Sequence, residues 1–340
     1  MRKILSLCLL SSLTSFTFAG QNTQGLPADA VGVIAFNLET FNQTKIGQAV
    51  WPTIPDTQES ALFKQEIGFD PATEIKEFVM GIYAGPDGKV DQKNPIVAGL
   101  IRGTFKQDKC EAYAESNGIY PKNVGNLRVW DINEIQKAMG NPNGDTPVNA
   151  GALITGAPGI MAFASSGLVE KTVAAISQPT SQLKLPAGTE TYLETVQKPW
   201  LFIAMNGSKF ADAAKAGVET ITVVAGESPT HFQLGIYLNF KNKDLATDTN
   251  NKLNALLLLG TMAASSSEDG KTPDEITQQR AVAELVKDTK ISTEDTRVMI
   301  TVNFPADQAA QLIRSAIEKA QANQGAFTLG TNLPKPLKKK

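Results

Sequence analysis

The segment Val31-Gly-Val-Ile-Ala-Phe-Asn37 decides the fold that this sequence predicts. It is rich in β-branched and apolar residues, which favour a strand. Residues 38–50 follow at once with the apolar spacing of a helix. A strand that leads directly into a helix is therefore the expected building unit of the chain.

The same kind of unit recurs along the sequence, and turn signals separate the strands. Gly85-Pro-Asp-Gly88 and Gly156-Ala-Pro-Gly159 each predict a hairpin between neighbouring strands. Strands joined by hairpins argue against a purely parallel sheet. The predicted fold class is therefore α+β, with two lobes that each hold an antiparallel or mixed sheet with helices packed on one face. The predicted strands are 31–37, 75–84, 96–105, 127–131, 152–155, 160–164, 201–206, 219–225, 231–240 and 297–304, and the predicted helices are 38–50, 108–116, 168–176, 208–216, 243–259, 274–287 and 305–320.

Two pairs of segments suggest an internal duplication. Ile34-Ala-Phe-Asn-Leu-Glu-Thr-Phe41 aligns with Ile203-Ala-Met-Asn-Gly-Ser-Lys-Phe210, and Thr104-Phe-Lys-Gln-Asp108 aligns with Asn239-Phe-Lys-Asn-Lys243. Each pair covers an exit from a strand into a helix. The alternative is chance similarity, because Asn and Lys are common where helices begin.

Length and composition predict two domains and an exported product. At ~150 residues per domain the chain has room for about two, and the Pro-, Ser- and Thr-rich stretch 179–198 lies between them. The predicted organisation is a signal peptide (1–19), an N-terminal α+β lobe (20–178), a linker (179–198), a C-terminal α+β lobe (199–323) and a disordered basic tail (324–340).

The first residues have the three parts of a secretory signal. Arg2 and Lys3 precede an apolar run over 4–13, and Thr17-Phe-Ala19 offers small residues at a cleavage site. The alternative is an uncleaved membrane anchor, but the run is shorter than the ~18–20 residues that span a bilayer. We expect a periplasmic or extracellular protein with no transmembrane segment in the mature chain.

The overall composition is that of a folded protein in water. Hydrophobic residues make up 42% of the chain and charged residues 19%, which allows a packed core. The formal net charge is −2, and it becomes −4 once Arg2 and Lys3 are removed. Nucleic acid is therefore excluded as the main partner, because phosphate binding needs a positive surface.

Three segments carry a resemblance to a known group of proteins. Leu26-Pro-Ala-Asp-Ala-Val-Gly-Val-Ile-Ala-Phe-Asn37, Gly68-Phe-Asp-Pro71 and Val97-Ala-Gly-Leu-Ile-Arg-Gly-Thr-Phe105 together resemble a loose group of exported bacterial proteins of unknown function. The resemblance implies a location in the cell envelope or outside the cell. It implies no reaction and no functional residues.

Cysteine and histidine are scarce, which limits the possible chemistry. Once the signal is removed only Cys110 remains, so no disulfide forms within the chain. Cys110 is interpreted as a small half-buried side chain of a helix, rather than as a nucleophile that needs a nearby base. His231 is the only histidine, so zinc sites with several His or Cys ligands are excluded. His231 is interpreted as a structural residue at the start of a strand.

Two loops place oxygen ligands close together, and each is a candidate calcium site or an ordinary solvated turn. One holds Asp87, Asp91 and Asn94, and neither loop has the spacing of an EF-hand. The second loop contains Asn141, Asn143 and Asp145.

A Ser–His–Asp or Cys–His site could use only His231, and carboxylates near strand ends are the other candidate acid–base groups. Asp29, Asp70 and Asp131 occupy such positions, but their spacing does not pair them. The sequence contains no phosphate-binding loop, no dinucleotide fingerprint and no Gly-x-Ser-x-Gly motif. We therefore assign no catalytic, cofactor-binding or metal-binding residue from the sequence and expect no cofactor.

Aromatic and basic residues offer two further hypotheses about partners. Trp51, Trp130 and Trp200 are interpreted as core or rim residues, although exposed tryptophans would suit a sugar ring or a protein partner. The lysines of the tail are interpreted as a solvated end rather than as a contact with an anionic surface.

Three functional classes remain open. The favoured class is a non-catalytic binding or interaction module, whose partner is an envelope protein or a second copy of itself. The second class is a small-ligand binder with a site between the lobes. The third is a hydrolase that uses two carboxylates about 5–10 Å apart. A large exposed apolar patch would favour the first class.

Overall fold

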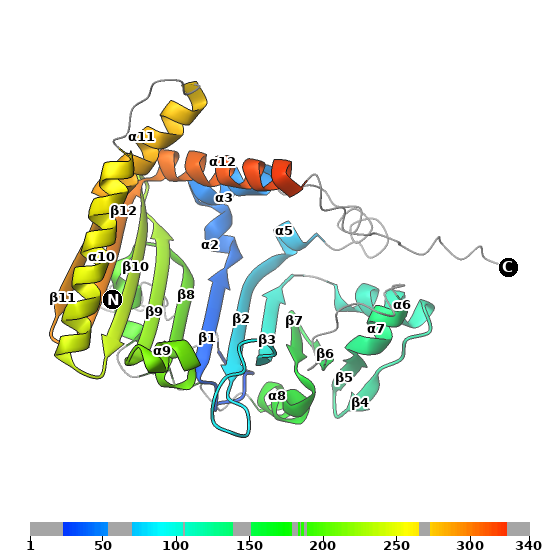
Figure 1. The fold of residues 1–340 in the computed structure, drawn as a ribbon. Coiled ribbons are helices and arrows are strands. Elements are labelled where there is room, and N and C mark those ends of the chain that lie inside the picture. Colours follow the sequence, from blue (N-terminus) through cyan, green and yellow to red (C-terminus); the bar gives the residue numbers. More distant parts are fainter. Residues whose placement is uncertain are drawn as a thin grey trace, which may run out of the picture.

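The computed structural model describes residues 23–53, 70–104, 106–138, 151–178, 183, 185–186, 189–264 and 273–324. The predicted signal peptide, and all of the predicted basic tail except Gln324, lie outside these residues. The described residues form one twelve-stranded sheet with helices at its ends and on its faces (Figure 1).

Each strand pairs antiparallel with its neighbours, in the order β11-β12-β10-β9-β8-β1-β2-β3-β7-β6-β5-β4. The predicted antiparallel α+β fold class is confirmed. The strands are β1 (Gly32–Asn37), β2 (Ile75–Tyr83), β3 (Ile96–Gly103), β4 (Lys122–Val124), β5 (Leu127–Asp131), β6 (Ala152–Ala157), β7 (Ile160–Ala164), β8 (Pro199–Asn206), β9 (Val218–Glu227), β10 (His231–Phe240), β11 (Thr289–Glu294) and β12 (Arg297–Pro305).

The helices follow the strands in the predicted alternation. The α-helices are α2 (Leu38–Asn42), α3 (Lys45–Val50), α5 (Pro71–Glu74), α6 (Gln107–Ser116), α7 (Ile132–Ala138), α8 (Val169–Ser177), α9 (Ala211–Lys215), α10 (Lys243–Ala264), α11 (Pro273–Lys287) and α12 (Ala306–Gln324). Short 3-10 helices are η1 (Trp51–Thr53), η3 (Ser166–Leu168), η4 (Glu190–Thr195) and η5 (Gly207–Lys209).

The two predicted lobes share this one sheet. β1 pairs with β8 in its middle, where Ile34 lies opposite Ile203. Outward from this pair, one half continues as β1-β2-β3-β7-β6 and the other as β8-β9-β10-β12-β11. In each half the first three strands in chain order are followed by the last strand and then by the one before it, and the N-terminal half continues beyond β6 with β5 and β4.

The internal duplication stays a prediction, and two features support it. The repeated strand order is one. The other is a matching helix cap: the side chain of Asn37 accepts a hydrogen bond from Thr40 N at 2.7 Å, and that of Asn206 accepts one from Ser208 N at 3.2 Å. These are the two asparagines that the sequence alignment places together. A shared cap at the first strand exit is what two copies of one unit would retain.

One face of the sheet carries the main hydrophobic core. Val33, Ala35 and Phe202 point to this face, where they are buried with residues of the N-terminal segment and of α8. Part of the predicted linker also packs here, because Leu183 and Tyr192 are buried in the same cluster. This segment therefore contributes to the core instead of running freely between domains.

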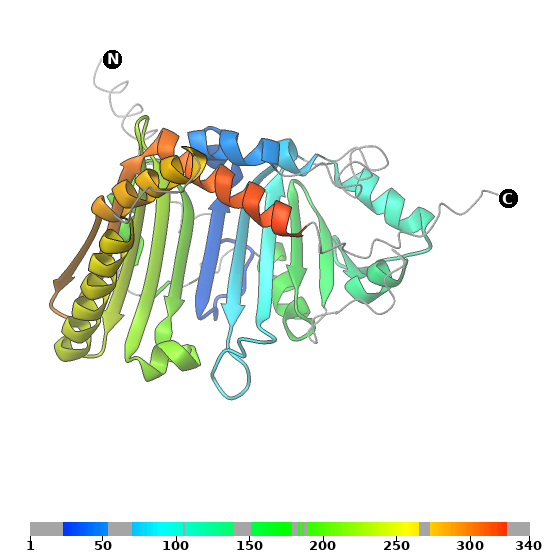
Figure 2. The same ribbon diagram turned by 45° about the horizontal axis from the view of Figure 1, so that its top comes forward.

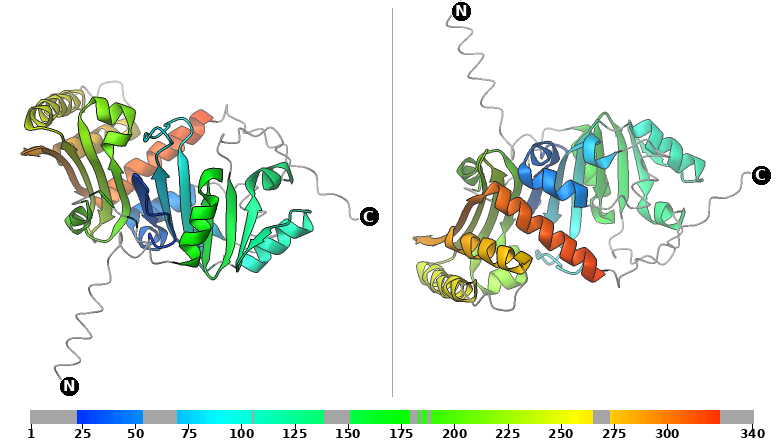
Figure 3. Two further views of the ribbon diagram at one scale, coloured as in Figure 1. Left: turned by 90° about the horizontal axis from the view of Figure 1, so that it is seen from below. Right: turned by 90° about the horizontal axis from the view of Figure 1, so that it is seen from above.

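The other face carries three smaller clusters, each under a helix. α12 and α3 cover the strand ends near Phe304, α10 and α9 cover Val298, and α6 covers Met161. Figure 2 shows α12 passing across the ends of the central strands. Figure 3 shows α10 at the outer edge of the molecule, beside β11 and β12.

Helix boundaries differ from prediction where side chains cap a turn. Residues 38–50 form two helices instead of one, because the side chain of Thr44 accepts a hydrogen bond from Gly47 N and begins α3. Pro305 ends β12 rather than beginning the last helix. β4, α7 and β11 were not predicted at all.

Candidate interaction surface

Helix α10 lies along one flank of the sheet, and its first half carries charged residues whereas its second half carries none. Its first half includes Asp248 and Lys252, which form an ion pair at 2.6 Å. From Leu253 to its end at Ala264 it has no charged residue. Among the described residues, no helix is both long and apolar enough to cross a membrane. The uncharged half of α10 consists of apolar residues apart from Asn254, Gly260 and Thr261.

The inner side of α10 packs against the protein. Ala246 is fully buried in the cluster of Val298, and Leu253 packs on the same cluster. A side-chain carbon placed on Gly260 would lie 3.8 Å from Val286 of α11. These contacts hold α10 on the sheet.

The outer side of α10 is also apolar, and it is exposed. Leu256, Leu258, Leu259 and Met262 are 63%, 62%, 60% and 66% exposed, and Ala255 beside them is exposed as well. We call these five residues the α10 outer face. Four consecutive leucines turn through about 300° at ~100° per residue, so they cannot all face inward.

The exposed α10 outer face is costly for a protein that stays alone in water. Full burial of one leucine side chain is worth about 1.5–3 kcal/mol, and three leucines here forgo much of that gain. Single exposed leucines are ordinary, but a contiguous apolar patch marks an interaction site. The α10 outer face is therefore the strongest candidate for a functional surface among the described residues.

A second apolar feature crosses the middle of the sheet, on the face that carries the three smaller clusters. Ile236 lies opposite Val223, Val223 opposite Ile203, Ile203 opposite Ile34, and Ile34 opposite Met80. These five side chains are half-buried, and none is part of the three helix-covered clusters. We call them the central row, because they lie where the two halves of the sheet meet.

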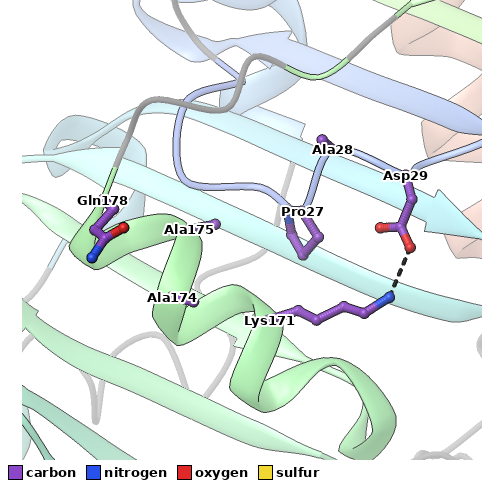
Figure 4. A pocket seen from close by; sticks show the side chains of 7 residues that line it. All are labelled: Pro27, Ala28, Asp29, Lys171, Ala174, Ala175 and Gln178. Atoms are coloured by element: carbon purple, nitrogen blue, oxygen red, sulfur yellow. Dashed lines mark hydrogen bonds and ion pairs between the residues drawn. The ribbon is translucent and has the colours of Figure 1, made fainter.

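A shallow depression lies elsewhere, between the N-terminal segment and α8. It has a volume of about 440 Å³ and is lined by Pro27, Ala28, Asp29, Lys171, Ala174, Ala175 and Gln178. Lys171 and Asp29 form an ion pair at 2.8 Å across it (Figure 4). Both charged side chains are more than half exposed. The depression is open and is not between the two halves, so it does not match the expected ligand cleft.

His231 and Cys110 occupy structural positions. His231 begins β10, where its ring Nδ1 lies 2.8 Å from Thr230 Oγ1 and its backbone N donates to Ser228 Oγ. Cys110 lies half-buried on α6, against the cluster of Met161. Burial raises the pKa of the Cys110 thiol, so little thiolate forms at neutral pH.

In the candidate calcium loop, the aspartate side chains accept hydrogen bonds from backbone N–H groups of the loop itself. Asp87 Oδ1 accepts a hydrogen bond from Lys89 N at 3.1 Å, and Asp91 Oδ1 accepts one from Lys93 N at 2.9 Å. The hydrogen bonds from Lys93 N and Asn94 N hold the pKa of Asp91 below its usual value. No group of three His, Cys, Asp or Glu residues suited to a metal occurs in the described part of the chain. Asn141, Asn143 and Asp145 lie outside that part.

The three candidate acid–base carboxylates lie at separate places. Asp29 precedes β1 near the end of β2, and Asp70 lies before the start of β2, about 30 Å away along its nine residues. Asp131 ends β5, four strands beyond β2 in the sheet, so about 19 Å separates these strands. Its side chain accepts a hydrogen bond from Asn133 N. The structure does not bring these residues together as a hydrolytic pair.

The tryptophans are core and rim residues, as predicted. Trp130 is 1% exposed and donates a hydrogen bond to Thr155 Oγ1 at 3.0 Å, and Trp200 is 9% exposed. Trp51 is half-buried and donates to Asn42 Oδ1.

Comparison with known proteins gives structural similarity only. No family description and no curated protein matches the sequence. The fold is similar to crystal structures of TP0453, a Treponema protein. Crystal form III gives a TM-score of 0.46 at 11% identity, covering 86% of this chain and 98% of that chain. Crystal form IV gives 0.46 at 9% identity, covering 88% and 99%. Because these TM-scores are below 0.5, nothing about function is transferred from TP0453.

Proposed function

We propose that this chain is an exported, non-catalytic interaction protein whose contact surface is the α10 outer face. The observation that carries the proposal is the exposure of Leu256, Leu258, Leu259 and Met262 by 60–66% on a stretch without charge. Burial of this surface by a partner would recover the hydrophobic free energy that the isolated chain forgoes. The location outside the cytoplasm rests on the predicted signal peptide and on the resemblance to exported proteins.

The polar residues that could have supported chemistry support this proposal instead. Asp29 pairs with Lys171, Asp131 caps α7 and Asp91 closes a turn. The thiol of Cys110 is held in its protonated form by burial. These groups have structural roles that explain their presence without a reaction.

Site-specific photo-cross-linking tests the proposal directly. A photoreactive residue at position 258, in the chain expressed in its native producer, is expected to give discrete covalent adducts, because a partner covers this position. The matched control is position 120, where Tyr120 is 69% exposed on a different part of the molecule. No adduct at position 258, or the same adducts at both positions, would reject the α10 outer face as the contact surface.

The small-ligand class keeps one supporting observation, the central row, where half-buried apolar side chains of both halves meet. Its test is a thermal-shift screen with elongated apolar compounds. A ligand at 100-fold its dissociation constant stabilises a protein by about 2.7 kcal/mol. The shift should disappear in Ile203→Gln if the row is the site, and persist in Leu258→Gln.

A further inference from the structure

We propose that the partner on the α10 outer face is a second copy of this chain, paired through an antiparallel, two-fold contact between the two α10 helices. The proposal rests on the proposed function, because it names the occupant of the same surface. It follows from two features of α10, namely the spacing and the sizes of its residues.

The spacing is that of a helix–helix seam. Ala255, Leu258, Leu259 and Met262 recur at i, i+3, i+4 and i+7, which places them in one stripe along the helix. Leu253 and Leu257, which are half-buried, lie on the opposite side. The helix therefore carries two apolar stripes, one against its own sheet and one left for a second helix.

The sizes of the side chains suit an antiparallel copy. If a two-fold axis passes between Leu258 and Leu259, each Leu258 meets Leu259 of the other copy. The same axis places Ala255, the smallest residue of the stripe, opposite Met262, the longest. Large-against-small alternation lets two helices approach closely. A two-fold axis also makes both sides of the contact identical, as in most homodimers.

A lipid surface fits the same residues less well. Between residues 243 and 288 the sequence has eight acidic and five basic residues and no Phe, Tyr or Trp. Helices that lie on membranes are rich in Lys and Arg and use Trp and Phe as anchors, and anionic lipids repel acidic segments.

Sedimentation equilibrium of the purified exported chain tests the proposal. A contact made through one stripe of a single helix is at the weak end of specific interfaces, so the protein concentrations should extend to about 0.5 mM. The measured molar mass is expected to rise with protein concentration toward that of two chains. The double substitution Leu258→Glu and Met262→Glu should weaken the dimer at least about 100-fold, with an unchanged circular dichroism spectrum because both side chains are exposed. Tyr120→Glu is the control and should leave the mass as in the wild type.

A cross-linking test in a Cys110→Ser background then fixes the direction of pairing. A short bifunctional thiol reagent should join two copies of Leu259→Cys, which lies next to the axis. It should not join two copies of Asp244→Cys, which an antiparallel pair separates by about 43 Å at ~1.5 Å per residue. Efficient linking at position 244 would overturn the antiparallel contact.

Failure of this proposal is distinguishable from failure of the proposed function. A wild-type chain that stays monomeric at every concentration, or a dimer that the double substitution leaves intact, overturns self-pairing through α10. If position 258 then cross-links to a different protein, the second copy is rejected while the α10 outer face is retained as a contact surface.

Discussion

Phe202→Ala is expected to lower the free energy of unfolding by about 3–5 kcal/mol, the range for truncating a buried phenylalanine. Phe202 is fully buried in the main core. It lies on β8, opposite Ala35 of β1 and Val224 of β9. The cavity would therefore open where the two halves of the sheet join. Urea unfolding followed by circular dichroism measures the loss.

The same experiment reports whether the halves fold together. Because β1 and β8 belong to one ladder, we expect the variant and the wild type each to unfold in a single transition. The matched control is Tyr120→Ala, which removes a side chain that is 69% exposed and should change stability by no more than about 0.5 kcal/mol. Two separate transitions, or a loss below about 1 kcal/mol for Phe202→Ala, would contradict the shared core.

Glu227→Ala is expected to cost about 2–4 kcal/mol, since hydrogen bonds to a charged group are worth more than neutral ones. Glu227 ends β9 and is 5% exposed. Its carboxylate accepts hydrogen bonds from Lys45 N at 2.6 Å and from Ile46 N at 3.3 Å. These are the first N–H groups of α3, where a negative charge is also favourable. The substitution leaves both N–H groups without this acceptor.

Two control variants make this prediction specific. Glu227→Gln keeps one acceptor oxygen and should lose less stability than Glu227→Ala. Glu219→Ala changes an exposed glutamate on the same strand and should be nearly neutral, within about 0.5 kcal/mol. Equal stability of Glu227→Ala and Glu219→Ala by urea unfolding would show that the carboxylate does not hold α3.

Local patterns in the sequence were enough for most strands and for the fold class. β8 is a continuous apolar run, β10 alternates along most of its length, and Gly85-Pro-Asp-Gly88 marked the turn that follows β2. β11 was missed because only Ile291 interrupts its polar residues. It is an edge strand, and edge strands often carry polar and charged side chains.

Long-range packing could not be read from the sequence. Residues 179–198 looked like a linker because of their prolines, yet Tyr192 stacks on Tyr237 with ring centroids 3.9 Å apart. The pairing of β3 with β7 and of β1 with β8 joins segments far apart in the chain. No local pattern encodes such contacts, and they decide that both halves share one sheet.

The candidate surface was missed for a related reason. The sequence predicts a helix over 243–259, but it does not show which of the leucines from Leu256 to Leu259 face outward, because leucine is most often buried. The available signal was the absence of charge from Leu253 to Ala264 on a helix with only one side against the sheet. A helix that is apolar all round at the surface lacks the polar outer face that water requires.

Oxidation footprinting of Met262 tests the central claim, that a partner covers the α10 outer face, most directly and without any substitution. In the dilute purified chain the Met262 thioether is 66% exposed and should be oxidised rapidly by peroxide. Met161, which is 8% exposed, serves as the slow internal reference. In the native producer we expect Met262 to be oxidised several-fold more slowly relative to Met161, because a partner shields it. Equal relative rates in both settings would show that the surface stays uncovered and would contradict the account.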